Sequence, residues 1–119
     1  MKILVCGSRS ITDQAWVFEK IDNFITTFGF SKENMTIIHG GAKGIDSLAG
    51  QWAAANNVKV EVHAADWARY GRGAGIRRNK DMVLAADYVL ILWDGISKGT
   101  KNDIDLCIKN GKQYKIIYK

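Results

Sequence analysis

The chain contains no proline, and it has only two cysteines and two histidines among its 119 residues. Without proline, the ends of helices and strands must be set by glycine and by side chains that cap helices. Cys6 and Cys107 lie far apart in apolar surroundings, and His39 and His63 have no ligand partner at metal-site spacing. We therefore expect buried, unreactive thiols, no metal site and no bound cofactor.

Long hydrophobic runs are also absent. No apolar stretch approaches the roughly 20 residues that a membrane-spanning helix needs. Met1 leads directly into a strand-like apolar run, without the pattern of a signal peptide. We therefore expect a cytoplasmic protein that does not associate with membranes.

The composition, with 47% apolar and 24% charged residues, is typical of a globular protein. Because the chain has no internal repeat, linker or low-complexity segment, residues 1–119 are expected to form one domain. The net charge of +5 is compatible with nucleic acid or with a pocket for an anionic small molecule. Four of the five arginines lie between Arg69 and Arg78, and they can line a pocket without forming a continuous basic track. A small anionic ligand is therefore favoured over nucleic acid.

Strand and helix patterns alternate along the chain. Apolar or β-branched runs predict five strands, at residues 3–6, 36–39, 58–62, 88–93 and 114–118. Apolar positions at helical spacing predict a helix that Thr12 caps and Gly29 ends, another that begins near Ile45, one from about Gly75 to Ala86, and one from Thr100 to Gly111. Residues 63–75 are expected to form a loop.

This alternation predicts the α/β class, with a doubly wound, five-stranded parallel sheet. The continuous apolar runs 3–6 and 88–93 are typical of central strands, whereas the alternating run 58–62 and the lysine-rich run 114–118 are typical of edges. The predicted strand order is therefore 3-2-1-4-5. Ligands bind such sheets at the carboxyl ends of the strands, beside the point where the strand order reverses. The loops after the first, second and fourth strands should meet there.

The segment Gly40-Gly41-Ala42-Lys43-Gly44 joins the second strand to its helix. Glycine permits a sharp turn and lets backbone amides approach a ligand, and a helix N-terminus attracts anions, so this segment is a candidate phosphate site. Its spacing matches neither a Walker A loop nor the dinucleotide fingerprint. The alternative is a tight turn without a ligand. Asp46, in the first turn of the helix, could cap that helix or accept a ribose hydroxyl.

A second candidate anion site follows the fourth strand, from Asp94 to Thr100. Ser97 and Gly99 lie in this loop, and Thr100 would begin a helix whose amides face the pocket. Asp103 stands three residues later. It could complete a capping box, lie near a ribose, or do both.

The loop from Ala65 to Gly75 is long and carries two aromatic residues, Trp67 and Tyr70. Aromatic rings can stack on a base, and arginines such as Arg77 can hold phosphate. The alternative is an exposed lid whose tryptophan is anchored in the core.

Several of these segments, in this order, resemble the YspA-like branch of the SLOG superfamily, which joins the Smf/DprA DNA-processing proteins with the Lonely Guy enzymes. The matching residues are Gly7-Ser8-Arg9, Gly40 to Asp46, Asp66-Trp67, Arg78-Asn79, Met82 and Gly95 to Thr100. The resemblance covers nearly the whole chain. It implies a Rossmann-like fold and a nucleotide-type ligand, and this branch is often interpreted as a ligand sensor.

Lonely Guy enzymes are phosphoribohydrolases that release a base from nucleoside 5′-monophosphates. Their motifs are Pro-Gly-Gly-x-Gly-Thr-x-x-Glu and an arginine four residues before a methionine. Here Arg78 stands four residues before Met82, and Gly99 to Asp103 matches the first motif in part, with aspartate replacing glutamate. If the ligand is hydrolysed, the resemblance implies that Asp103 stabilises the sugar and Arg78 offsets developing negative charge.

The likeness to Smf/DprA implies DNA binding as a third function. The likeness to Lonely Guy enzymes, whose pockets a neighbouring subunit completes, implies a homodimer or a higher homo-oligomer. Arg78 and Asp103 are the candidate catalytic residues. The residues expected to contact the ligand are Gly7, Ser8, Arg9, Gly40, Gly41, Ala42, Lys43, Gly44, Asp46, Trp67, Arg77, Asn79, Asp94, Ser97, Gly99 and Thr100.

Overall fold

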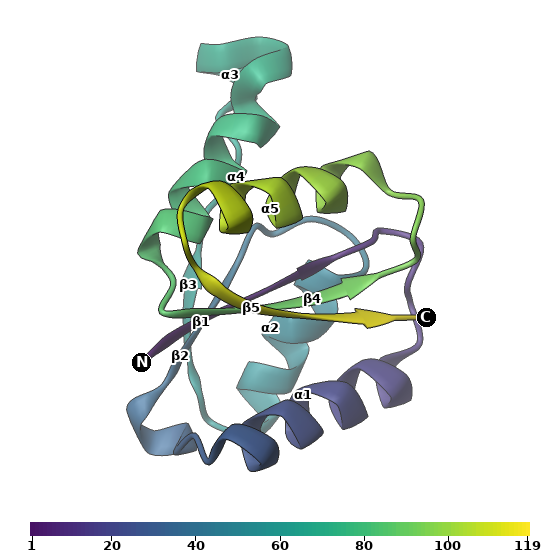
Figure 1. Cartoon of the computed structure of the whole chain (residues 1–119), viewed down its shortest axis with the longest axis vertical. Helices are drawn as coiled ribbons and strands as arrows, with labels where there is room; N and C mark the ends of the chain where they lie inside the picture. The colour runs from purple at the N-terminus through teal and green to yellow at the C-terminus, as the bar shows by residue number, and fades with distance from the viewer.

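The computed structural model describes the whole chain, residues 1–119. It contains one five-stranded sheet of order β3-β2-β1-β4-β5, in which every pair of neighbouring strands is parallel (Figure 1). The strands are β1 (Lys2–Gly7), β2 (Thr36–His39), β3 (Lys59–Val62), β4 (Tyr88–Trp93) and β5 (Gln113–Tyr118). The predicted fold class and strand order are confirmed.

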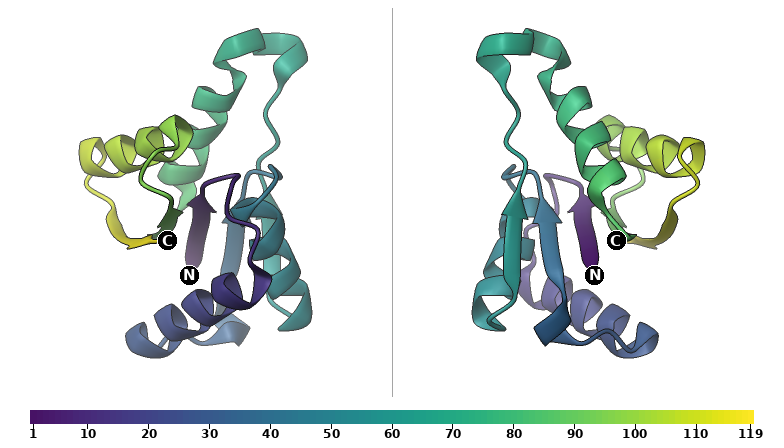
Figure 2. Two further views of the ribbon diagram at one scale, coloured as in Figure 1. Left: turned by 90° about the vertical axis from the view of Figure 1, so that its right-hand side faces the viewer. Right: turned by 90° about the vertical axis from the view of Figure 1, so that its left-hand side faces the viewer.

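Helices cover both faces of the sheet (Figure 2). One face packs against α1 (Gln14–Phe28) and α2 (Ile45–Ala55), and the other packs against α4 (Ala74–Ala85) and α5 (Lys98–Lys109). A short helix α3 (Trp67–Tyr70) and two 3₁₀ turns, η1 (Lys32–Asn34) and η2 (Gly71–Gly73), complete the structure. None of the helices is both long enough and apolar enough to cross a membrane.

The two cores follow from the alternation of side chains along the central strands. In β1, Ile3 and Val5 pack into the core under α1 and α2, whereas Leu4 and Cys6 pack into the core under α4 and α5. All four side chains are buried. Because β1 is covered on both faces, its sequence reads as a continuous apolar run rather than an alternating one.

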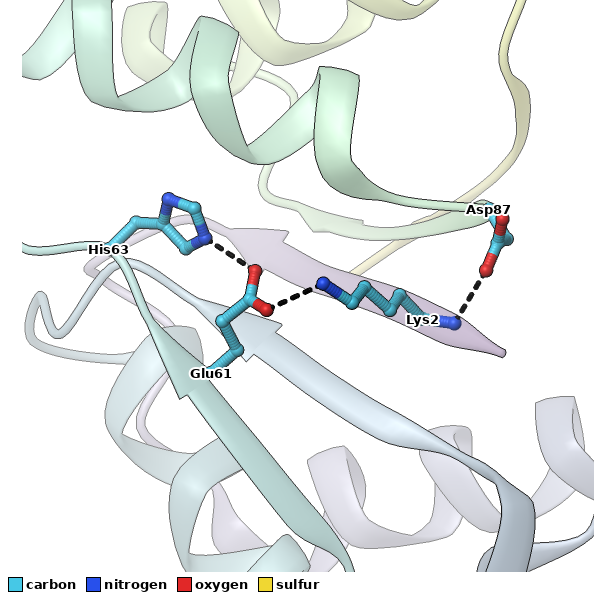
Figure 3. A network of polar contacts seen from close by, with 4 residues as sticks. All are labelled: Lys2, Glu61, His63 and Asp87. Carbon is cyan, nitrogen blue, oxygen red and sulfur yellow. Dashed lines mark hydrogen bonds and ion pairs between the residues drawn. The ribbon is translucent and has the colours of Figure 1, made fainter.

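The edge strand β3 carries a polar network on the face that α4 and α5 share (Figure 3). Lys2 Nζ in β1 lies 2.7 Å from Glu61 Oε1 in β3, and the other oxygen of Glu61 lies 2.7 Å from Nε2 of His63. Hydrogen bonding to His63 and then to Lys2 lowers the pKa of Glu61. The Lys2 side chain thus spans β2 and ties the edge strand to the centre of the sheet.

Three local predictions are corrected by the structure. The side chain that caps α1 is Asp13 rather than Thr12, since its carboxylate accepts the amide of Trp16 at 3.1 Å. Helix α5 begins at Lys98 with Ser97 as its cap, two residues before the predicted start at Thr100. The predicted loop 63–75 contains α3, which Asp66 caps through the amide of Arg69, and η2.

Residues 66–76 form an arm that rises beyond the carboxyl edge of the sheet (Figures 1 and 2). The arm comprises α3, η2 and the first residues of α4. Trp67 on the arm is 56% exposed, so it is not the core anchor that the lid alternative requires. The arm therefore overhangs the edge of the sheet where the loops meet.

At Gly7, the end of β1, the central strands β1 and β4 lie too close together to leave room for a side chain. A Cβ atom at Gly7 would collide with the backbone carbonyl of Leu92 in β4 and would lie 2.8 Å from Ile45 Cγ1. Gly7→Ala is therefore expected to lower the free energy of unfolding by about 3 kcal/mol in urea denaturation. Gly73→Ala is the control, because a Cβ there meets no atom within 4 Å. Equal stability of the two variants would contradict this packing.

Candidate functional site

A cavity of about 410 Å³ opens at the carboxyl edge of the sheet, beside the reversal of strand order between β1 and β4. The loops after β1, β2 and β4 contribute to its wall, together with α4 and α5. The lining residues are Cys6, Gly7, Arg9, Ser10, Ala42, Asp46, Arg78, Asn79, Met82, Asp94, Ser97, Gly99, Thr100 and Asp103. The structure thus brings together residues from all the loops that the sequence predicts to meet.

Asp46 determines the shape of the glycine-rich turn after β2. Its Oδ2 accepts the amides of Gly40 at 3.1 Å and of Ala42 at 3.2 Å. The amide of Gly41 donates to Nδ1 of His39 at 3.1 Å. These three amides are therefore used inside the protein, and the turn does not present them to a phosphate as the sequence suggested. Asp46 Oδ1 takes no hydrogen bond from the chain and remains available in the cavity wall.

Gly44 brings the turns after β1 and β2 into contact. Its φ is +76°, and a Cβ atom there would lie 2.7 Å from Cα of Arg9. Only glycine accepts both the left-handed conformation and this close approach. The turns after β1 and β2 are therefore packed backbone against backbone, which positions Arg9 at the cavity.

Asp103 lies in the cavity wall on α5 and is 5% exposed. Its Oδ1 has no hydrogen-bond partner. The pKa of Asp103 is raised to about 7. Burial is the largest cause and the Asp46 carboxylate acts in the same direction, whereas hydrogen bonding by Cys6 and the charge of Arg78 oppose them. Asp103 does not form the capping box considered from the sequence, because the side chain that caps α5 is Ser97. Asp103 lines the cavity instead, with Oδ1 buried and unpartnered.

Arg78, on α4, joins the arm to the turn after β2. Its Nη1 donates to the carbonyl of Gly40 at 2.6 Å, and its Nε donates to Oδ1 of Asn79 at 2.9 Å. Burial raises the pKa of both Asp46 and Asp103, and the charge of this guanidinium acts in the opposite direction. Although burial, the largest effect, raises the pKa of Asp46, Arg78 places a compensating positive charge beside the two carboxyl groups.

Asp94 organises the turn that leads into α5. Its Oδ1 accepts the amides of Ile96 and Ser97, each at 2.8 Å, and its Oδ2 accepts the hydroxyl of Ser10 at 2.7 Å. These bonds, led by the one from Ser97, hold the pKa of Asp94 well below its usual range. The amides of Lys98 and Gly99, at the start of α5, find no acceptor in the chain. Free amides at a helix N-terminus favour an anion, and the start of α5 offers two of them beside the cavity.

The remaining predicted residues lie outside this cavity. Gly40, Gly41 and Trp67 line a neighbouring cavity of about 200 Å³, together with Arg9, Ala42 and Arg78. Ser8 is fully buried and accepts the amide of Asp94 at 3.0 Å, so its role is to hold the turn. Lys43 is exposed and Gly44 is buried; neither lines one of these cavities.

Arg77 stacks on the ring of Tyr70, with 4.3 Å between its Cζ atom and the ring centroid, and it too lies outside the cavity wall. Three wall residues, Cys6, Ser10 and Met82, were not among the predicted contacts. Ser10 directly follows the Gly7-Ser8-Arg9 segment, and Cys6 ends the buried strand before it, so extending that segment by one residue each way would have found both.

Comparisons with known proteins address the family of this chain. The model of the family described as "YspA, cpYpsA-related SLOG family" matches residues 1–70. The Gene 61 protein of Mycobacterium phage D29 is 36% identical to this chain, over 85% of this chain and 83% of that protein. The chain belongs to the YspA, cpYpsA-related SLOG family. The resemblance stated from the sequence is confirmed.

Two solved structures of DNA processing protein A (DprA) share the fold. The X-ray structure of the Streptococcus pneumoniae protein has a TM-score of 0.76 at 17% identity, and it matches 99% of this SLOG chain and 50% of its own. The Helicobacter pylori protein, in a structure concerned with its binding of single-stranded DNA, has a TM-score of 0.67 at 16% identity and matches 100% of this chain and 66% of its own. This chain therefore spans half to about two thirds of these neighbours, and at such identity the likeness shows the fold.

The raised pKa of Asp103 predicts a pH dependence of stability. Because the folded protein binds this proton up to a pH of about 7, against 3.8 for the ordinary group, folding loses stability as the pH rises between these values. In urea denaturation, the free energy of unfolding of the wild type should fall by about 2–3 kcal/mol between about pH 5 and pH 8 because of this group. Asp103→Asn should abolish that fall. Asp105→Asn, an exposed carboxyl group on the same helix, should keep the wild-type dependence. Parallel curves for wild type and Asp103→Asn would contradict the assignment.

Proposed function

We propose that this SLOG protein binds a nucleoside phosphate in the 410 Å³ cavity. The observation that carries the proposal is the unpartnered Oδ1 of Asp103, a buried carboxylate oxygen in the wall of an open cavity. A buried acceptor without a donor is costly, and a sugar hydroxyl is a donor of the right kind. Oδ1 of Asp46 is a second free acceptor in the same wall. Two carboxylate oxygens suit the neighbouring hydroxyls of a ribose.

The phosphate of such a ligand would bind at the start of α5. The free amides of Lys98 and Gly99 and the positive end of the helix dipole favour an anion there. Arg9, which lines the same cavity and forms no ion pair in the chain, supplies a full positive charge. The cavity therefore combines acceptors for hydroxyl groups with donors for a phosphate, which are the two requirements of a nucleotide.

Binding of nucleoside monophosphates tests this proposal. In isothermal titration calorimetry with AMP, GMP, CMP and UMP, at least one should bind, and the matching nucleoside should bind more weakly. Asp103→Ala should weaken that binding about tenfold, because a charge-assisted hydrogen bond is lost. Asp105→Ala is the matched control and should bind as wild type does. Absence of binding across the panel, or equal loss in both variants, would contradict the proposal.

Hydrolysis of the bound nucleotide is a second candidate function, and the pKa of Asp103 favours it. A carboxyl group with a pKa of about 7 can act as an acid or a base near neutral pH. Arg78 and the second carboxyl group, Asp46, line the same cavity. The candidate catalytic residues from the sequence, Arg78 and Asp103, therefore share one wall.

Release of free base distinguishes an enzyme from a binding protein. The wild type is incubated with each monophosphate, and the base is quantified by chromatography. If the protein is a phosphoribohydrolase, Asp103→Ala should abolish release even at nucleotide concentrations that saturate the variant. Binding without release by the wild type would reject hydrolysis and leave the binding proposal intact.

DNA binding is a third candidate, since the Helicobacter pylori neighbour is described as binding single-stranded DNA. The net charge of +5 is compatible with it. A strand bound through its phosphates would lose affinity steeply with added salt. Asp46 and Asp103 in the cavity wall favour the smaller ligand, because carboxylate oxygens accept hydrogen bonds from sugar hydroxyls and repel the phosphates of a strand.

A further inference from the structure

A second large cavity lies between the arm and the start of α5. It has a volume of about 430 Å³, and we call it the arm cavity. It shares Arg9, Arg78, Asn79 and Gly99 with the first cavity, so the two are adjacent. Its other wall residues are Trp67, Arg72, Gly75, Ile76, Lys98 and Asn102. The start of α5, where the first phosphate is proposed to bind, therefore lies at the junction of the two cavities.

The two cavities differ in charge. The wall of the first contains three aspartates, whereas the arm cavity has no acidic residue and four cations, Arg9, Arg72, Arg78 and Lys98. None of these four forms an ion pair in the chain. Arg78 lies near the carboxyl groups of Asp46 and Asp103. The other three cations have no acidic residue in this wall, and an anion between them reduces their mutual repulsion. The arm cavity is therefore built for negative charge.

Hydrogen-bond donors in the arm cavity point to the same chemistry. Nδ2 of Asn102 is buried and has no acceptor in the chain, although a buried donor normally has one. The free amide of Gly99 lies in the same wall. Trp67 forms part of this wall and packs close to Gly75, where a Cβ atom would lie 3.4 Å from its ring. Donors and cations beside an aromatic wall match a group rich in acceptor oxygens.

We infer that the arm cavity is an oligophosphate subsite, and that the ligand is a nucleotide with phosphate groups beyond the first. This inference rests on the proposed function, since it extends the same ligand from the sugar site past the start of α5. The sugar lies over Asp46 and Asp103, the first phosphate lies at the junction, and the further phosphates lie among Arg72, Lys98 and Asn102. The first cavity selects the nucleoside, and the arm cavity selects the length of the phosphate chain.

The test compares nucleosides that carry one, two and three phosphates. The base is the one that binds best as the monophosphate, or adenine if none binds, and inorganic triphosphate is a probe without a base. Titration calorimetry is done with EDTA at constant ionic strength. The variants are the double substitution Arg72→Gln with Lys98→Gln, and Arg69→Gln as control. Arg69 lies on the same arm against the ring of Tyr70 and does not line the arm cavity.

In the wild type, affinity should rise with each phosphate, and the double variant should lose about tenfold or more for the triphosphate. Its affinity for the monophosphate should fall by a smaller factor than its affinity for the triphosphate, because the backbone amides at the start of α5 remain. Arg69→Gln should leave both affinities within about threefold of wild type. Equal affinity for the three nucleotides, or a double variant that binds the triphosphate as wild type does, would overturn the oligophosphate subsite while the nucleoside cavity stands.

Failure of the proposed function would look different. If no nucleoside monophosphate binds but inorganic triphosphate does, and the double variant loses it, the subsite stands and the nucleoside cavity falls. A short oligothymidylate is the last probe. If it binds more tightly than any nucleoside phosphate and the double variant loses it, the occupant of the arm cavity is a DNA strand, and the inference of an oligophosphate is overturned.

Discussion

The carboxylate of Asp46 holds the turn after β2 in place, and the rest of the site depends on that turn. By accepting the amides of Gly40 and Ala42, it fixes the carbonyl of Gly40 at the edge of the sheet. Arg78 donates to that carbonyl and so attaches the base of the arm to the sheet. These bonds act together with the packing of Met82 and Val83 of α4 against the sheet to hold the arm over the cavities. The glycine-rich turn thus supports the site through the bonds that Asp46 and Arg78 make with it.

The aspartates that border the first cavity differ in how many hydrogen-bond donors the surrounding loops bring to them. Asp94 is saturated by Ser10 and by two backbone amides, so its charge stabilises the turn rather than repelling an anion. Asp103 has no such partners, and burial raises its pKa instead. Two aspartates that border one cavity therefore differ in role because one is surrounded by donors and the other is not. Arg9 and Arg78 line both cavities, whereas Arg72 on the arm and Lys98 at the start of α5 line the arm cavity alone.

The sequence predicts the strand order well because central and edge strands differ in local hydrophobicity. The alternation of Val60 and Val62 with charged residues indicates an edge, and these valines are 42% and 54% exposed in β3. The meeting of the loops at one edge follows from the strand order. What the sequence does not show is which partner each polar group chooses. Asp46 could cap a helix or bind a sugar by its position in the chain, but the fold of the preceding turn brings two amides to it first.

The arm could not be predicted for a related reason. From hydrophobicity alone, Trp67 could be buried in the core. The short helix that carries it projects from the sheet instead and leaves the ring largely exposed. Likewise, nothing in the order of residues shows that Arg72 and Lys98 line one cavity, since they come from separate helical segments. Contacts of this kind depend on the assembled structure, and only local patterns can be read without it.

The central claim is that the free carboxylate oxygens of the first cavity receive the hydroxyl groups of a sugar. A crystal structure of the protein with its tightest-binding nucleoside phosphate tests this most directly. We expect a ribose hydroxyl within hydrogen-bond distance of Asp103 Oδ1 and a phosphate at the start of α5. A ligand bound elsewhere, with Asp103 Oδ1 still unpartnered, would contradict it.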